Sequence, residues 1–106
     1  MIEITPVVLN ENRFLGIVVY LPKCTMRLLF NMKLIVTDRC FNLNEIEKKC
    51  PIPIVQCASL HFDHLDYENV LKCSKVAVQL GIQPHMAVKE AIGCVFPGKK
   101  PSEECF

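Results

Sequence analysis

Residues 63–92 read DHLDYENVLKCSKVAVQLGIQPHMAVKEAI, and the interpretation of the whole chain depends on how this stretch folds. Between residues 66 and 80 its apolar and small side chains recur every three or four positions, which predicts an amphipathic helix. Gly81 stands where a helix ends in a left-handed residue, and Ile82 is placed to fold back onto the last turn. Pro84 can open a second, shorter helix. The stretch therefore predicts two helices separated by a glycine stop.

The chain before this stretch is rich in short apolar runs, which predict β-strands. Residues 14–21 read FLGIVVYL, and this continuous run of β-branched and aromatic side chains predicts a central strand with both faces covered. Residues 2–9 predict its hairpin partner, and Pro6 within that run favours an edge position. Further strands are predicted for residues 24–30, 33–37 and 52–60, of which the first two could equally form one bent strand.

A short helix is predicted over residues 43–49, and Cys50-Pro51 ends it. Asn42 or Asn44 can cap it, and Glu45 stands three residues before Lys48 and four before Lys49, at spacings that favour ion pairs. A strand, a short helix and another strand make a compact βαβ element. The predicted class is therefore α+β, with a four- to five-stranded, mostly antiparallel sheet and helices packed on it.

The composition predicts one domain over residues 1–96 and a flexible tail over residues 97–106. Of the 106 residues, 51% are hydrophobic and 22% are charged, so the chain can bury a core and disorder is not expected. The tail is rich in turn-forming and charged residues. The net charge is +1, which gives no electrostatic reason to expect nucleic acid or an anionic membrane as a partner.

Location and oligomeric state are predicted from hydropathy. The first residues lack a basic segment leading into an apolar one, so no signal peptide is expected. The longest apolar run, residues 14–21, is far shorter than the roughly 20 residues that a membrane-spanning helix needs. We therefore expect a cytoplasmic protein. Its mean hydropathy of +0.28, in so short a chain, predicts apolar surface covered by a homo-oligomer.

Seven cysteines are dispersed along the chain without any Cys-x-x-Cys pair. A disulfide framework is typical of short secreted chains, and a zinc knuckle needs closely spaced pairs of ligands. Because neither pattern is found, most of the cysteines are predicted to be reduced thiols. Cys57 and Cys73 lie on apolar elements and are predicted to be core residues.

Several short motifs occur in a familiar order. They are Thr5-Pro6-Val7, Leu21-Pro22-Lys23, residues 33–37, Leu80-Gly81-Ile82, Met86 and Lys89-Glu90-Ala91-Ile92. Over residues 2–93 the chain resembles the YunC-like family, small bacterial and archaeal proteins of unassigned function, which have a Leu-Gly-Ile turn, a Gly-Met pair and an Arg-Glu-Ala-Leu helix. The resemblance implies a shared fold and no function.

Two departures from the family pattern bear on chemistry and backbone conformation. Thr37-Asp38 stands where the family has a Cys-Gly pair at a strand end, so any chemistry of that thiol is missing here. His85 stands where the family has a glycine before Met86.

The most suggestive cluster of ligand-type residues is His61, Asp63 and His64, in a segment predicted as a loop after a strand. Two imidazoles and a carboxylate could bind zinc or another divalent metal, and His85 could complete the set. The spacing matches no recognised ligand motif, and Asp63 could simply cap a helix.

Cys40 is the candidate catalytic residue. A thiol beside Arg39 and close to a helix N-terminus would have a lowered pKa and be reactive, although the sequence places no base beside it. Lys23, Arg27 and Lys33 could also form a basic rim that binds an anion, although charged residues at sheet edges usually protect against aggregation.

The function that these observations favour is a non-catalytic, oligomeric assembly or binding module. The alternative is a small enzyme or sensor that uses a divalent metal at His61, Asp63 and His64, or the thiol of Cys40. The chain has no phosphate-binding glycine loop, no Gly-x-Ser-x-Gly elbow and no His-Glu-x-x-His helix. No small-molecule ligand can be named from the sequence.

Overall fold

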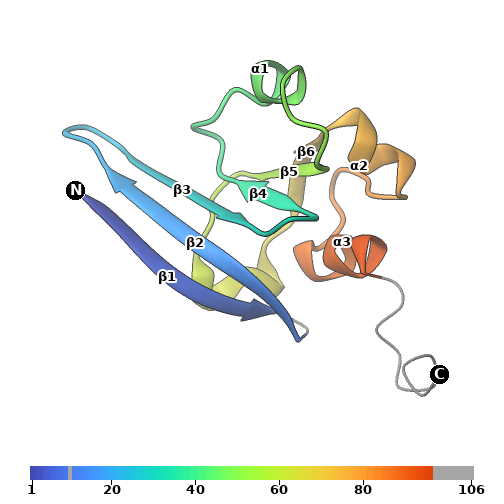
Figure 1. Cartoon of the computed structure of the whole chain (residues 1–106), viewed down its shortest axis with the longest axis horizontal. Coiled ribbons are helices and arrows are strands. Elements are labelled where there is room, and N and C mark those ends of the chain that lie inside the picture. The colour runs from blue at the N-terminus through green and yellow to red at the C-terminus, as the bar shows by residue number, and fades with distance from the viewer. Residues whose placement is uncertain (10, 97–106) are drawn as a thin grey trace.

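The computed structural model, which describes residues 1–9 and 11–96, shows an α+β fold built on one mixed six-stranded sheet (Figure 1). The strands lie side by side in sequence order, and every neighbouring pair is antiparallel except β4 and β5, which run parallel. The elements are β1 (Ile2–Leu9), β2 (Asn12–Tyr20), β3 (Thr25–Phe30), β4 (Ile35–Thr37), α1 (Leu43–Glu47), β5 (Ile54–Cys57), the 3-10 helix η1 (Phe62–Tyr67), β6 (Val70–Cys73), α2 (Lys75–Gln79) and α3 (Val88–Val95).

The N-terminal hairpin forms as predicted, with β1 at the edge of the sheet, but β2 is not covered on both faces. Buried residues of β2 alternate with exposed or half-buried ones, beginning with buried Asn12, exposed Arg13 and buried Phe14. Because successive side chains of a strand point to opposite faces, one face of β2 lies in the core and the other is open. The continuous apolar run therefore did not indicate a second covering layer.

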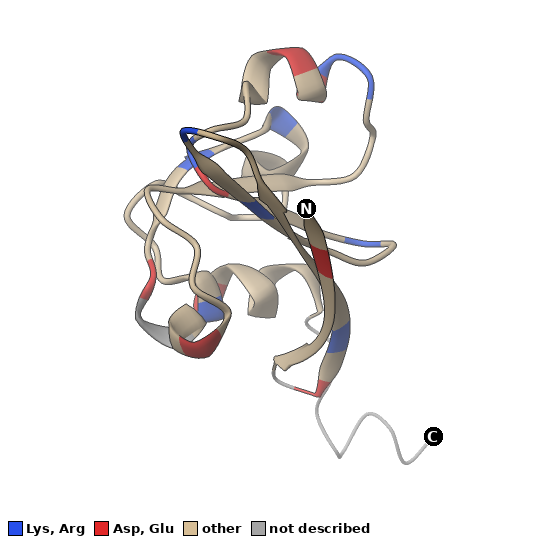
Figure 2. Cartoon of the chain, turned by 90° about the vertical axis from the view of Figure 1, so that its left-hand side faces the viewer, with Lys and Arg blue, Asp and Glu red and all other residues tan. Residues whose placement is uncertain are grey.

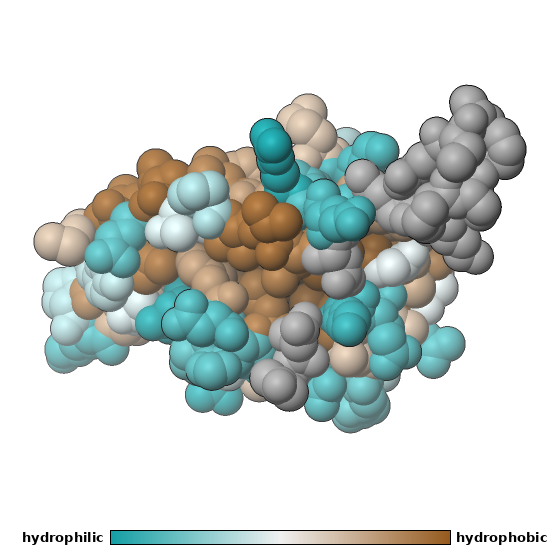
Figure 3. All heavy atoms as spheres, turned by 90° about the horizontal axis from the view of Figure 1, so that it is seen from below, coloured by the Kyte–Doolittle hydropathy of each residue, from teal (hydrophilic) through white to brown (hydrophobic). Residues whose placement is uncertain are grey.

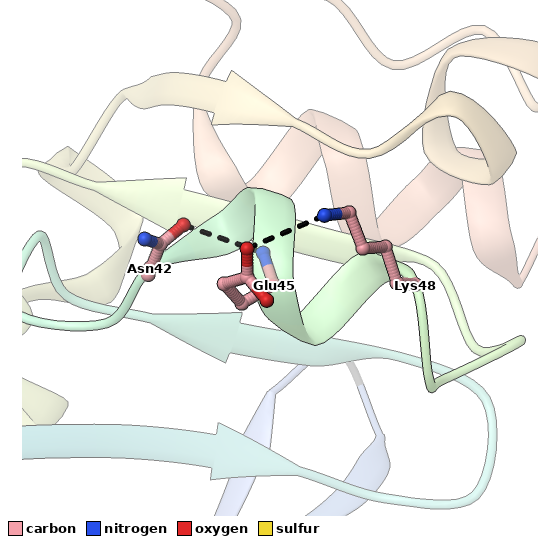
Figure 4. A network of polar contacts seen from close by, with 3 residues as sticks. All are labelled: Asn42, Glu45 and Lys48. Carbon is pink, nitrogen blue, oxygen red and sulfur yellow. Dashed lines mark hydrogen bonds and ion pairs between the residues drawn. The ribbon is translucent and has the colours of Figure 1, made fainter.

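The predicted βαβ element is confirmed in β4, α1 and β5. The side chain of Asn42 caps α1, its Oδ1 accepting a hydrogen bond from the backbone N–H of Glu45 at 3.3 Å (Figure 4). Lys48 Nζ lies 3.3 Å from Glu45 Oε1, which is the predicted i, i+3 pair. Parallel strands need a crossover connection, and α1 supplies it on one face of the sheet.

The helix predicted over residues 66–80 is wrong in its first half. Residues 70–73 form β6, which pairs with β5 from Val55 opposite Cys73 to Cys57 opposite Val70. Without β6, one side of β5 would carry unpaired backbone groups, and this requirement outweighs a periodicity that a four-residue run can satisfy in either state. The sheet therefore has one strand more than the four to five predicted, and α2 begins only at Lys75.

The glycine stop is confirmed, but the helix predicted to open at Pro84 begins at Val88. Gly81 has φ of +97°, and the backbone N–H of the buried Ile82 donates a hydrogen bond to the Ala77 carbonyl at 3.1 Å. His85 has φ of +73°, in the left-handed region that favours glycine, and its N–H bonds to the Val70 carbonyl. The segment before α3 is therefore tied to β6 instead of forming a helical turn.

The core lies between one face of the sheet and the elements η1, α2 and α3, while α1 lies on the opposite face above β4 and β5 (Figure 1). Phe62 of η1 packs directly over Gly16 of β2, where a Cβ atom would lie 2.7 Å from the ring. The fully buried apolar side chains of this core include Leu29, Val36, Val55, Cys57, Ala77, Ile82 and Ala91. The predicted tail, residues 97–106, lies outside the described residues.

Candidate functional site

The carboxyl ends of β4 and β5 bring three buried polar residues together. Thr37 is the last residue of β4 and Asp38 follows it, and Gln56 lies beside Thr37 in the parallel register. All three are at least 95% buried, with exposed fractions of 2%, 5% and 4%. In sheets with parallel strands, ligands bind beyond the carboxyl ends of those strands, so this edge is the first place to look for a site.

Hydrogen bonds from these residues fix the loop that leaves β4. Asp38 Oδ2 accepts from the backbone N–H of Arg27 at 2.8 Å, and its Oδ1 accepts from the backbone N–H of Cys40 at 2.9 Å. Gln56 Nε2 donates to the carbonyl of Asp38 at 3.2 Å and to that of Phe41 at 2.6 Å. Among the described residues, the buried hydroxyl of Thr37 has no hydrogen-bond partner.

A cavity of about 410 Å³ opens beside this loop, and its lining is mostly polar. Arg39, Cys40, Asn42 and Asn44 line it from the loop and α1, Gln56 from β5 and Lys72 from β6. A smaller cavity of about 190 Å³ shares Arg39 and Cys40 and is also lined by Arg27 and His61. The loop therefore has a hollow on each side.

The structure corrects the prediction of a lowered pKa for Cys40. Its thiol is exposed and its pKa is raised, first by desolvation and then by the carboxylate of Asp38, against which the cation of Arg39 has a smaller lowering effect. The hydrogen bond from the backbone N–H of Cys40 to Asp38 Oδ1 holds this carboxylate close to the thiol. The direction of this shift favours the neutral thiol over the thiolate that a nucleophilic cysteine needs.

The predicted core position is confirmed for Cys57 and holds only in part for Cys73. Cys57 is fully buried, and desolvation raises the pKa of its thiol to about 12. Cys73 is half-buried against the core, and its Sγ donates to the Ile82 carbonyl at 3.7 Å. All six cysteines within residues 1–96 are free thiols.

The candidate metal ligands His61, Asp63 and His64 lie at and within η1 as exposed residues. His61 Nδ1 lies 3.4 Å from Glu68 Oε2, so this imidazole has a carboxylate neighbour other than Asp63. No group of three side chains of the described residues is arranged to hold a metal ion.

The predicted basic rim is not brought together. Lys23 precedes β3 and Lys33 follows it, so the two lysines lie near opposite ends of that strand, with Arg27 between them. Lys33 Nζ instead lies 5.8 Å from the centre of the Phe96 ring, within the range of a cation–π contact.

The N-terminal half of the sheet has an apolar surface that we call the open face. Cross-strand partners share a face, so the register joins side chains from β1, β2 and β3 on the side opposite the core. Its apolar members are Ile2, Ile4, Pro6 and Val8 of β1, Leu15, Ile17 and Val19 of β2, and Met26, Leu28 and Phe30 of β3.

The open face is exposed to solvent in the described structure. Ile2 and Ile4 are each 62% exposed and Val8 is 64% exposed. Helix α1 lies on the same side of the sheet but packs on β5, so it does not cover these residues. Seen from the hairpin side, the strands show few charged positions, and from below hydrophobic residues lie along the upper part of the hairpin half, with hydrophilic residues below them (Figures 2 and 3). Such a continuous apolar surface marks an interaction site more often than a bare monomer surface.

Comparison with known proteins supports the fold and assigns no activity. No family model matches the chain, and no curated protein matches it. The structure is similar to the crystal structure of a protein of unknown function from Thermoplasma acidophilum, with a TM-score of 0.78 over 90% of this chain and 93% of that chain. The two sequences are 16% identical, so the likeness establishes the α+β fold alone.

Two features of the site were missed in the sequence. Gln56 lies within a run predicted as a strand. Nothing in that run indicates that this polar residue lines a cavity. The open face was expected only as a general excess of apolar residues, because the sequence could not show which faces the helices cover. No helix of the described residues is long and apolar enough to span a membrane.

Proposed function

We propose that this protein is a non-catalytic assembly module that forms a homodimer by stacking the open faces of two copies. The observation that carries this proposal is the exposure of Ile2, Ile4 and Val8 on one side of a sheet whose other side is the core. Their burial in a dimer would remove from water apolar surface that the single chain leaves exposed.

A second copy is the occupant that fits this surface best. The face is a nearly flat apolar sheet surface, and two such faces are complementary to each other as in a β-sandwich, with a spacing of about 10 Å. Among the described residues, Arg13 is its charged member, opposite Val8 near the hairpin end. A two-fold arrangement would leave this charge at the rim of each copy.

The size of the face indicates a modest affinity. Three strands of about eight residues span roughly 27 by 14 Å, and two such rough surfaces together bury on the order of 1,000 Å². That area lies at the low end of specific interfaces. We therefore expect a concentration-dependent equilibrium between monomer and dimer.

Pairing of β1 edges is a less suitable route to the dimer. Pro6 lies in the middle of β1, opposite Leu15, and has no N–H to donate to another strand. An edge with an interrupted ladder is a known protection against strand addition.

The test measures the mass of tag-free protein by analytical ultracentrifugation over a wide concentration range. Ile4→Glu places a charge in the centre of the open face and is expected to give a monomer at every concentration. Val78→Glu, on α2 at a position 55% exposed, is the matched control and should dimerise like the unsubstituted chain. A monomeric unsubstituted chain, or a dimer that survives Ile4→Glu, would refute the proposal.

Membership of the YunC-like family, a cytoplasmic location and the metal- or thiol-dependent alternative stay predictions. The positive φ of His85, where the family has glycine, supports the resemblance, since a glycine would adopt this conformation without strain. Native mass spectrometry of protein purified without chelator tests the alternative, because a stoichiometric divalent metal would favour an enzyme or sensor.

A further inference from the structure

The cavity beside the loop that leaves β4 has the features of a ligand site independent of the open face. We infer that it binds a small organic dianion that also carries a hydroxyl group. Its volume of about 410 Å³ falls within the usual range for small-molecule pockets, and its walls come from the loop, α1, β5 and β6.

Two cations from separate parts of the chain face this cavity. Arg39 comes from the loop after β4 and Lys72 from β6, and both are exposed. The ion pairs within the described residues are those of Glu45 with Lys48 and of His61 with Glu68, so neither Arg39 nor Lys72 takes part in one. Two positive charges that line one cavity and have no ion-pair partner among the described residues favour a ligand with two negative groups.

Gln56 provides a hydrogen-bond acceptor in the wall of the same cavity. Gln56 is 96% buried. Its Nε2 group donates both of the hydrogen bonds that orient the side chain, to the carbonyls of Asp38 and Phe41. The amide is thereby fixed with its nitrogen toward the loop, and no hydrogen bond of the described structure uses Oε1. An unused acceptor in the wall of a cavity favours a ligand that donates a hydrogen bond.

The neighbouring asparagines complete the polar lining. Asn42, which lines the cavity, uses its Oδ1 to accept from the backbone N–H of Glu45, and its Nδ2 group makes no hydrogen bond within the described residues. Amide donors and two cations match carboxylate or phosphate oxygens, and Gln56 Oε1 matches a hydroxyl. L-malate, with two carboxylates and one hydroxyl, is the simplest probe, and succinate is the same dianion without the hydroxyl.

The experiment follows the backbone and side-chain amide NMR signals of the full chain during titration with L-malate at low salt. We expect saturable shifts at residues 39–44, Gln56 and Lys72. Arg39→Gln and Lys72→Gln should each weaken binding by about fivefold, because a charge-assisted contact is lost from an exposed site. The matched control is Lys89→Gln on α3, an exposed lysine on the opposite side of the sheet, which should leave the affinity unchanged.

Succinate should bind more weakly than L-malate by a similar factor, since it leaves Gln56 Oε1 without a donor. Absence of saturable shifts with L-malate, or an equal loss of affinity in Lys89→Gln, would overturn the site. Equal affinities for L-malate and succinate would overturn the role of Gln56 and the requirement for a hydroxyl.

Discussion

The two halves of the sheet contain similar side chains but differ in what covers them. Strands β4 and β5 have α1 on one face and the core on the other, whereas β1–β3 have only the core. Ile54 of β5 and Ile4 of β1 lie on the same face of the sheet according to the register. Ile54 is fully buried and Ile4 is 62% exposed. The same type of side chain on the same face is therefore buried in one half of the sheet and exposed in the other.

The connections between strands explain this difference. Antiparallel neighbours such as β1, β2 and β3 are joined by short turns, which bring no covering element with them. The parallel pair β4 and β5 requires a crossover, and its helix α1 necessarily lies on one face. The covering of the sheet thus follows from strand direction as much as from side-chain composition.

The largest expected effect contrasts two identical substitutions. Ile54→Ala should cost about 2–5 kcal/mol of unfolding free energy, because it leaves a cavity in a fully packed site. Ile4→Ala should cost less than about 1 kcal/mol in the monomer, since Ile4 is largely in water. Urea denaturation at low protein concentration measures both, and equal losses would show that the two halves are covered alike.

A second contrast concerns two helix caps. Ser74 Oγ accepts hydrogen bonds from the backbone N–H groups of Ile54, at 3.0 Å, and Ala77, at 3.3 Å, and is buried. Ser74→Ala should cost about 2–3 kcal/mol, because it leaves a buried N–H of β5 unpaired. Asn42→Ala, at the exposed cap of α1, should cost about 0.5–1 kcal/mol. Thermal unfolding that ranks the two variants in the opposite order would contradict the structure.

The two faces of β2 can be compared at neighbouring positions. Gly16→Ala should cost about 1–3 kcal/mol, because the new Cβ would lie 2.7 Å from Phe62 Cε2. Leu15→Ala on the open face should cost less than about 1 kcal/mol. Adding Phe62→Leu should recover part of the loss in Gly16→Ala. A strictly additive double variant would show that the two residues do not compete for space.

The smallest expected effect is a pH dependence from Cys57. Its pKa of about 12 lies above the ordinary value of 9.0, so the folded state retains a proton that the unfolded state loses between these limits. Stability contributed by the neutral thiol is therefore complete below pH 9 and falls above it, by at most about 1.4 kcal/mol per pH unit. Denaturation at pH 8 and pH 10 measures the slope, and Cys57→Ala should be less stable at both but should lose this part of the slope. If the unfolding free energy of Cys57→Ala depends on pH as steeply as that of the unsubstituted chain, the pH dependence comes from other titrating groups.

The prediction from sequence succeeded where local chemistry decides the structure. An asparagine cap of α1, predicted at Asn42 or Asn44, is found at Asn42. The stop at Gly81 and the core position of Cys57 are also confirmed, because each of these features depends on the residue and its near neighbours. The strand at residues 70–73 was missed, since pairing with β5 outweighed a helical periodicity. The pKa of Cys40 was predicted in the wrong direction, because the sequence placed Arg39 beside it but could show neither the desolvation of the thiol nor the carboxylate of Asp38 against its backbone.

The sequence by itself determined which segments can be buried, the capped start of α1, the glycine stop after α2, and the α+β class of the chain. Only the tertiary structure decided which face of each strand lies in the core, which polar groups meet at the ends of β4 and β5, and where an apolar surface stays exposed. The physical reason is that burial and electrostatic environment belong to pairs of elements far apart in the chain. The propensities of single residues do not specify those pairs.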